Sequence, residues 1–98
     1  MQITEKLDGS RLQLKIDGML DTLTAPELEG KLNALLPQVT ELVLDLEELT
    51  YISSAGLRVI IGAQKTMLRQ GVMKLIHMQP GIREIFTITG LDRILTIE

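Results

Sequence analysis

The sequence contains no cysteine and no tryptophan, and it has a single His, a single Tyr and a single Phe. Without cysteine there are no disulfide bonds, no thiolate zinc site and no thiol nucleophile. One His excludes a metal site built from two histidines of the same chain. The 13 acidic and 10 basic residues give a formal charge of −3. This balance argues against nucleic-acid binding, because a binder needs a basic face to neutralise phosphates.

Long apolar runs are also missing. The longest, at residues 59–63, is far shorter than the roughly 20 residues that a membrane span requires. The N-terminus has no apolar core of signal-peptide length. We therefore expect a cytoplasmic protein without membrane insertion. The 98 residues are 45% hydrophobic and regularly patterned, which predicts one small domain over residues 1–98.

Two kinds of apolar pattern predict the strands. Residues 11–17 alternate strictly, so that Leu12, Leu14 and Ile16 share one face. Residues 41–46 are almost continuously apolar, which is typical of a central strand covered on both faces. Further strands are predicted at residues 2–6, 72–77 and 93–97.

The first predicted helix begins with a capping box. Thr24 is the expected N-cap, and Glu27, three residues later, completes the box. Leu23 and Leu28 are expected to pack as a hydrophobic staple across this helix start. Pro37 is predicted to end the helix.

Two further helices follow. The second is predicted from about Ser54 to Arg69 or Gln70, with Gly71 as its stop, and the third over residues 81–88. The broad face of the second helix is expected to contain Leu57, Ile60, Ile61, Gln64 and Leu68.

The resulting order, β-β-α-β-α-β-α-β, predicts an α/β fold. Strand–helix–strand units favour parallel pairing with right-handed crossovers. The first two strands are joined by a short turn at residues 8–10, so they are expected to be antiparallel. We predict a mixed sheet of four to five strands with helices mainly on one face.

A segment of small residues leads into the second helix, with the sequence Tyr51-Ile52-Ser53-Ser54-Ala55-Gly56-Leu57-Arg58. Small side chains at a helix N-terminus leave backbone N–H groups accessible, and the helix dipole there favours a negative charge. A serine in this place is either an N-cap or a hydroxyl exposed for phosphorylation. Ser53 and Ser54 can share these two roles.

The run DLEELTYISSAGLRVI at residues 45–60 resembles the signature of the STAS family, in particular its single-domain anti-sigma factor antagonists. Residues 18–25, GMLDTLTA, resemble the family's Gly-x-Leu-Asp-x-x-Thr-Ala block. Gly90-Leu91, after the helix that follows Pro80, is a third match. The three matches agree in order and spacing, so the resemblance covers nearly the whole chain and implies a STAS-like single domain.

The resemblance also implies site residues. The family's phospho-acceptor lies two residues before a Gly, which places it at Ser54 with Gly56 as that Gly; Ser53 is the second choice. Ser53 stands where well-known members often have Asp. Asp21 matches a family Asp associated with partner binding. The implied partner-binding set is Asp21, Ser53, Ser54, Ala55, Gly56, Leu57 and Arg58.

The function implied by the resemblance is that of an anti-sigma factor antagonist. The unmodified protein would bind a GHKL-type serine kinase that doubles as an anti-sigma factor, and so release the sigma factor. Phosphorylation at Ser54 would end this binding, and a PP2C-type phosphatase would restore it. The partner would supply ATP, since the chain has no Gly-rich phosphate loop and needs no cofactor. We expect a monomer or a weak dimer.

Other functions stay open at this point. A non-switching STAS subunit, or a scaffold in a lipid-transport or stress-signalling assembly, fits the same family. Catalysis would need an acid–base pair drawn from Asp21, Asp45, Glu47, Glu48 and His77, but no nucleophile–base arrangement is visible in the sequence. We therefore expect a protein that is not an enzyme. A response-regulator receiver would need an acidic pair after its first strand and a late Lys, which are missing.

Overall fold

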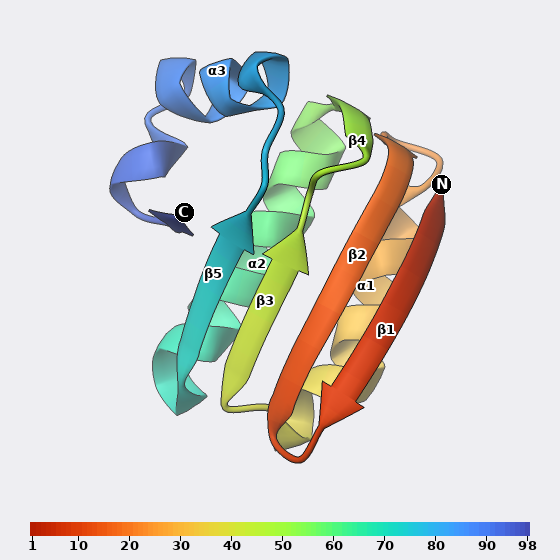
Figure 1. The fold of residues 1–98 in the computed structure, drawn as a ribbon, viewed down its shortest axis with the longest axis vertical. Helices are drawn as coiled ribbons and strands as arrows, with labels where there is room; N and C mark the ends of the chain where they lie inside the picture. Colours follow the sequence, from red (N-terminus) through yellow and green to blue (C-terminus); the bar gives the residue numbers. More distant parts are fainter.

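A mixed sheet of six strands forms the centre of the computed structural model, which describes residues 1–98 (Figure 1). The strands are β1 (Gln2–Asp8), β2 (Arg11–Leu20), β3 (Glu41–Asp45), β4 (Leu49–Ile52), β5 (Val72–Ile76) and β6 (Thr96–Ile97). The α-helices are α1 (Ala25–Leu35), α2 (Ser54–Gln70) and α3 (Pro80–Ile88). Short 3-10 helices follow α1 at Leu36–Gln38 and α3 at Leu91–Arg93. The mixed α/β fold with its helix order is confirmed.

The strand order is β1-β2-β3-β5-β6, with β1 antiparallel to β2 and the other neighbours parallel. The long strand β2 has two parallel partners. Its first half pairs with β3, from Arg11 opposite Glu41 to Lys15 opposite Asp45. Its second half pairs with β4, after a register shift at Gly18. The pairing with β4 brings the residues just before α2 to the end of β2.

The strand β4 was not predicted from the sequence. It has only four residues, and its burial does not alternate: Leu49 and Ile52 are buried while Thr50 and Tyr51 are exposed. A strand of this length without alternation has no period-2 signal. The segment is a strand because it pairs with β2, and this pairing is a long-range contact.

The core lies between the sheet and the pair α1 and α2, which cover one face of the sheet (Figure 1). The inward side chains of β2 and β3, such as Leu14 and Leu44, are fully buried there. The other face of the sheet has no helix over it and carries ion pairs, including Arg11 with Glu41. The helix α3 lies at the end of the sheet, next to β4 (Figure 1).

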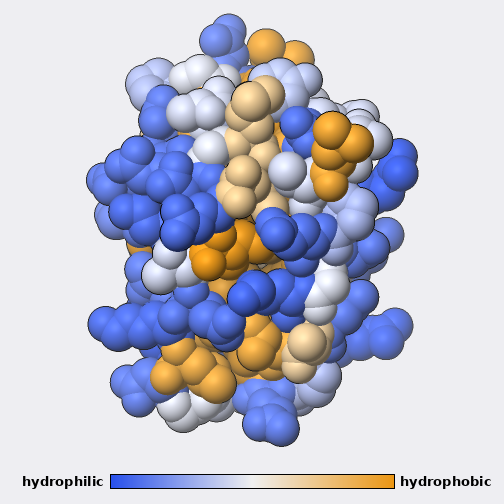
Figure 2. Space-filling model, turned by 90° about the vertical axis from the view of Figure 1, so that its right-hand side faces the viewer, coloured by the Kyte–Doolittle hydropathy of each residue, from blue (hydrophilic) through white to orange (hydrophobic).

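The strand β1 forms one edge of the sheet, beside α1. Figure 2 shows this side of the molecule, where apolar side chains lie between polar regions. Met1, Ile3 and Leu35 are half-buried against the core, and Lys31 of α1 bridges to Glu5 of β1 at 2.8 Å. This edge is therefore tied to α1 by both apolar contact and charge.

The capping box of α1 lies one turn earlier than predicted. The Thr24 N–H donates to Asp21 Oδ1 at 3.0 Å, and the Asp21 N–H donates to Thr24 Oγ1 at 2.8 Å. These reciprocal bonds are those of a capping box with Asp21 as the cap. Thr24 lies at the N-cap of α1 but makes no side-chain cap bond to that helix. The predicted staple is wrong, because Leu23 is 88% exposed.

The predicted bounds of α2 are confirmed, but its predicted apolar face is only partly correct. The residues buried on this helix are Gly56, Val59, Ile60, Ala63 and Met67. Leu68 is 73% exposed. The buried stripe is rotated from the predicted one because small residues allow α2 to lie close to the sheet. Gly71 ends the helix where a Cβ atom would lie 1.9 Å from the Thr40 carbonyl oxygen.

Candidate functional site

The two serines before and within α2 have different surroundings. Ser54 is the first residue of the helix and is exposed. Ser53 occupies the N-cap position with extended backbone, but its side chain makes no cap bond. Its Oγ atom is buried and has no hydrogen-bond partner. Of the two hydroxyls, that of Ser54 is the one on an exposed residue.

The start of α2 is held close to the end of β2 by one backbone bond and one tight packing contact. The Ser53 N–H donates to the Leu20 carbonyl oxygen at 2.9 Å. Gly56, the third residue of α2, packs so tightly against β2 that a Cβ atom on it would lie 2.7 Å from Leu20 Cγ. The residue after Leu20 is Asp21. The structure thus places the Asp21 loop beside the serine segment.

The Asp21 carboxylate is engaged within its own loop. Its Oδ1 atom accepts hydrogen bonds from the N–H groups of Leu23 and Thr24, at 2.9 and 3.0 Å. The backbone N–H of Thr24 contributes most to lowering the pKa of Asp21, and the Leu23 N–H adds to it. Asp21 therefore shapes the turn that presents Leu23 to solvent.

The remaining predicted residues divide into supporting and exposed positions. Gly56 is buried, and Ala55 and Leu57 are half-buried against the core. Arg58 is exposed, one turn beyond Ser54, and forms no ion pair. Of the seven predicted residues, Ser54 and Arg58 are thus the exposed ones.

Three exposed apolar residues on the segments that adjoin the serine segment are absent from the predicted site. Leu23 lies in the Asp21 loop at 88% exposure, and Met19 and Tyr51 are 49% and 47% exposed. Met19 and Tyr51 are opposite each other in the pairing of β2 with β4. Large exposed apolar side chains that lie together are typical of surfaces that bind other proteins. The sequence signal for this exposed surface is Leu23, a large apolar residue in a loop, but the predicted staple places it against Leu28.

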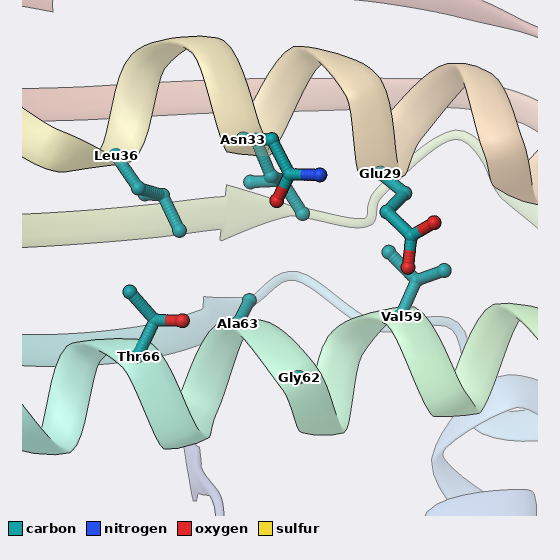
Figure 3. A pocket seen from close by; sticks show the side chains of 8 residues that line it. Glu29, Asn33, Leu36, Val59, Gly62, Ala63 and Thr66 are labelled. Carbon is teal, nitrogen blue, oxygen red and sulfur yellow. The ribbon is translucent and has the colours of Figure 1, made fainter.

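A groove lies between α1 and α2, and Figure 3 shows the part of it in the middle of the two helices. Near the N-terminal ends of the two helices, Thr22, Pro26 and Glu29 line one side of the groove and Ala55 and Arg58 line the other. Further along, side chains from both helices face each other across it, as Figure 3 shows. This further part is lined by Glu29, Leu32, Asn33, Leu36, Val59, Gly62, Ala63 and Thr66.

The residues considered for acid–base catalysis mostly have structural contacts. Asp45 is buried, and its Oδ1 atom lies 3.2 Å from His77 Nδ1 and accepts from the Glu47 N–H at 3.1 Å. Glu47 pairs with Lys15 at 3.8 Å, and Glu48 is exposed. No group of three or more His, Asp or Glu side chains is arranged to hold a metal ion. None of the helices combines the length and the apolar character that a membrane span needs.

Fold and site together define a small mixed α/β domain that displays a serine at the start of a helix, beside exposed apolar side chains. The family model for the STAS domain matches residues 2–98. The chain belongs to the STAS family.

Curated relatives of this chain carry names of one regulatory class. It is 36% identical over 100 residues to the putative anti-sigma factor antagonist BtrV of Bordetella bronchiseptica, covering 99% of this chain and 85% of BtrV. It is 33% identical over 98 residues to the anti-sigma-B factor antagonist of Bacillus subtilis, covering 99% and 90%. The phosphorylated form of the Bacillus cell fate determinant SpoIIAA shares the fold, with a TM-score of 0.77 at 18% identity over 99% of this chain and 91% of SpoIIAA.

Proposed function

We propose that this chain is an anti-sigma factor antagonist whose binding to its partner is controlled by phosphorylation of Ser54. The observation that carries the proposal is the exposed Ser54 at the first position of α2, with exposed apolar residues on the adjoining segments of β2, β4 and the Asp21 loop. The names of the curated relatives support the regulatory class. That SpoIIAA has been solved in a phosphorylated form supports a phosphorylation switch on this fold.

The proposed partner is a GHKL-type serine kinase that doubles as an anti-sigma factor, and a PP2C-type phosphatase reverses the modification. The docking surface consists of Leu23, Met19 and Tyr51 together with Ser54 and Arg58. Its apolar members supply the desolvated contacts that carry most binding energy in protein interfaces. All components act in the cytoplasm, and the chain itself, as a single STAS domain, contributes no catalysis.

The chemical step takes place in the kinase. Ser54 Oγ attacks the γ-phosphorus of ATP, the bond to the β-phosphate oxygen breaks, and ADP leaves. The hydroxyl proton goes to a base of the kinase. The product carries about 1.5 to 2 additional negative charges at the start of α2.

The modification weakens docking because of where the charge lies. A phosphate at a helix N-terminus is favourable in water, so α2 stays folded. In the docked complex the same phosphate would lie against Leu23 and Tyr51 or their apolar partners. Removing it from water there is costly, and the complex dissociates.

The test begins with the purified protein, its kinase and ATP, followed by mass spectrometry to locate the phosphate. We expect phosphate on Ser54. Ser54→Ala should bind the kinase as the unmodified protein does, and Ser54→Asp should bind at least about tenfold more weakly, a loss of ~1.4 kcal/mol.

Ser10→Asp is the matched control, because Ser10 is exposed in the turn between β1 and β2, at the opposite end of β2 from Leu20, which contacts the start of α2. It should bind normally. The absence of phosphate from Ser54, or equal binding by Ser54→Asp and Ser54→Ala, would contradict the switch. Full binding by Ser54→Asp would favour the non-switching scaffold.

A further inference from the structure

The start of α2 lacks the negative groups that helices usually have there. The first turn of this 17-residue helix contains no acidic residue, and the Ser53 side chain makes no cap bond. The Ser53 Oγ atom is buried without any partner. By contrast, the turn before α1 has the Asp21 carboxylate bound to its N–H groups. The positive end of the α2 dipole is therefore not compensated by a side chain.

Arg58 is placed to reach this helix start. It lies four residues after Ser54, and residues with this spacing share one face of a helix. Long helical side chains lean toward the N-terminus of their helix, so the Arg58 guanidinium can reach the turn that begins at Ser54. Both residues are exposed.

The Arg58 guanidinium is not engaged by any carboxylate. Of the 10 Lys and Arg side chains, those of Arg11, Lys15, Lys31 and Lys74 have carboxylates within 4.0 Å, and Arg58 is among those that have none. Glu29 lines the groove between α1 and α2 together with Arg58, but the two side chains form no ion pair. Asp21, the other acidic residue next to this segment, is bound within its own loop. The guanidinium is thus available to a new anion on α2.

We propose that Arg58 is the intramolecular partner of the phosphate on Ser54, forming an ion pair along α2 when Ser54 is phosphorylated. This inference rests on the proposed function, because it assumes that Ser54 is the modified residue. An Arg fork donates two parallel hydrogen bonds to phosphate oxygens, which makes such pairs strong and directional.

Two consequences follow for the switch. The phosphorylated helix is stabilised at its N-terminus, so the modification leaves the fold intact. Arg58 is also withdrawn from the docking surface at the same time as the phosphate is added. The partner then meets an added charge and loses a cation that the unmodified surface offers.

The pair is tested on protein in which phosphoserine is incorporated at position 54 during translation, so that no kinase is needed. The second ionisation of the phosphate is followed by ³¹P NMR as the pH is changed. A guanidinium beside the phosphate favours its doubly charged form. We expect the midpoint in Arg58→Gln to rise by about half a pH unit, in the range of an exposed ion pair.

Arg69→Gln is the matched control, because Arg69 is an exposed residue in the last turn of the same helix and has no ion pair. Its midpoint should equal that of the otherwise unchanged phosphoprotein. Arg58→Lys should give an intermediate midpoint, since Lys keeps the charge but not the fork. An unchanged midpoint in Arg58→Gln, or an equal rise in Arg69→Gln, would overturn the proposal.

Thermal unfolding gives an independent readout. Phosphoserine at position 54 should raise the melting temperature, and Arg58→Gln should reduce this gain, whereas Arg69→Gln should keep it. A gain that is the same in all three proteins would assign the effect to the helix dipole alone and reject the pair. Because phosphoserine is incorporated directly, a kinase that fails to modify Ser54 would contradict the proposed function and leave this result standing.

Discussion

The Ser53 N–H donates a hydrogen bond to the Leu20 carbonyl oxygen at 2.9 Å. This bond continues the pairing of β4 with β2, whose last matched residues are Leu20 and Ile52. Because Asp21 follows Leu20 and Ser54 follows Ser53, one backbone contact places the two candidate segments side by side. The geometry of the site therefore depends on the short strand β4.

Gly56→Ala should destabilise the protein by about 1–3 kcal/mol, as overpacking of a core does. A Cβ atom would lie 2.7 Å from Leu20 Cγ and 2.9 Å from Ile52 Cγ1, and α2 would have to shift. Urea denaturation measures the loss. Gly62→Ala is the control, since Gly62 lies in the same helix with open space around it. It should gain about 0.5–1 kcal/mol from helix propensity; a similar gain in Gly56→Ala would contradict the packing argument.

Asp21→Asn should change how stability depends on pH. The pKa of Asp21 is lowered in the folded protein, chiefly by the Thr24 N–H. The charged form therefore contributes stability above the unfolded-state pKa, near 3.9, and this contribution disappears as the pH falls through the lower folded-state pKa.

The difference in urea midpoint between the unchanged protein and Asp21→Asn should accordingly be constant from pH 5 to 7 and shrink below about pH 4. The Asn side chain can still accept the two N–H bonds, so the comparison isolates the charge. A difference that stays the same down to pH 2 would show that the Asp21 charge does not stabilise the loop.

Leu23→Ser should leave stability within about 0.5 kcal/mol, because the side chain is 88% exposed. The same substitution should weaken binding to the partner about tenfold if Leu23 lies in the docking surface. Leu28→Ala is the comparison for stability: Leu28 is fully buried, and its truncation should cost about 2–5 kcal/mol. A comparable loss of stability in Leu23→Ser would show instead that Leu23 packs against Leu28 as the predicted hydrophobic staple.

The position of the capping box shows where local sequence rules were insufficient. Thr24 with Glu27 and Asp21 with Thr24 both have the required three-residue spacing. In the structure the Thr24 hydroxyl accepts from the Asp21 N–H and donates to the Met19 carbonyl oxygen, at 2.8 and 2.9 Å. The hydroxyl is then unavailable to α1. The direction in which the chain leaves β2 decides which of the two capping boxes forms. Residue spacing carries no information about that direction.

The order of the three α-helices, the bounds of α2 and the place of Ser54 at its start follow from the sequence alone. These follow from alternation, helical spacing and the Gly71 stop, which are properties of neighbouring residues. Tertiary structure alone decided that Ser54 is exposed while the Ser53 hydroxyl is buried, and that Leu23 points to solvent. The two serines are placed by the pairing of β4 with β2, a contact between residues some 30 positions apart that no local pattern encodes. Leu23 is turned to solvent by the hydrogen bonds of the Asp21 loop.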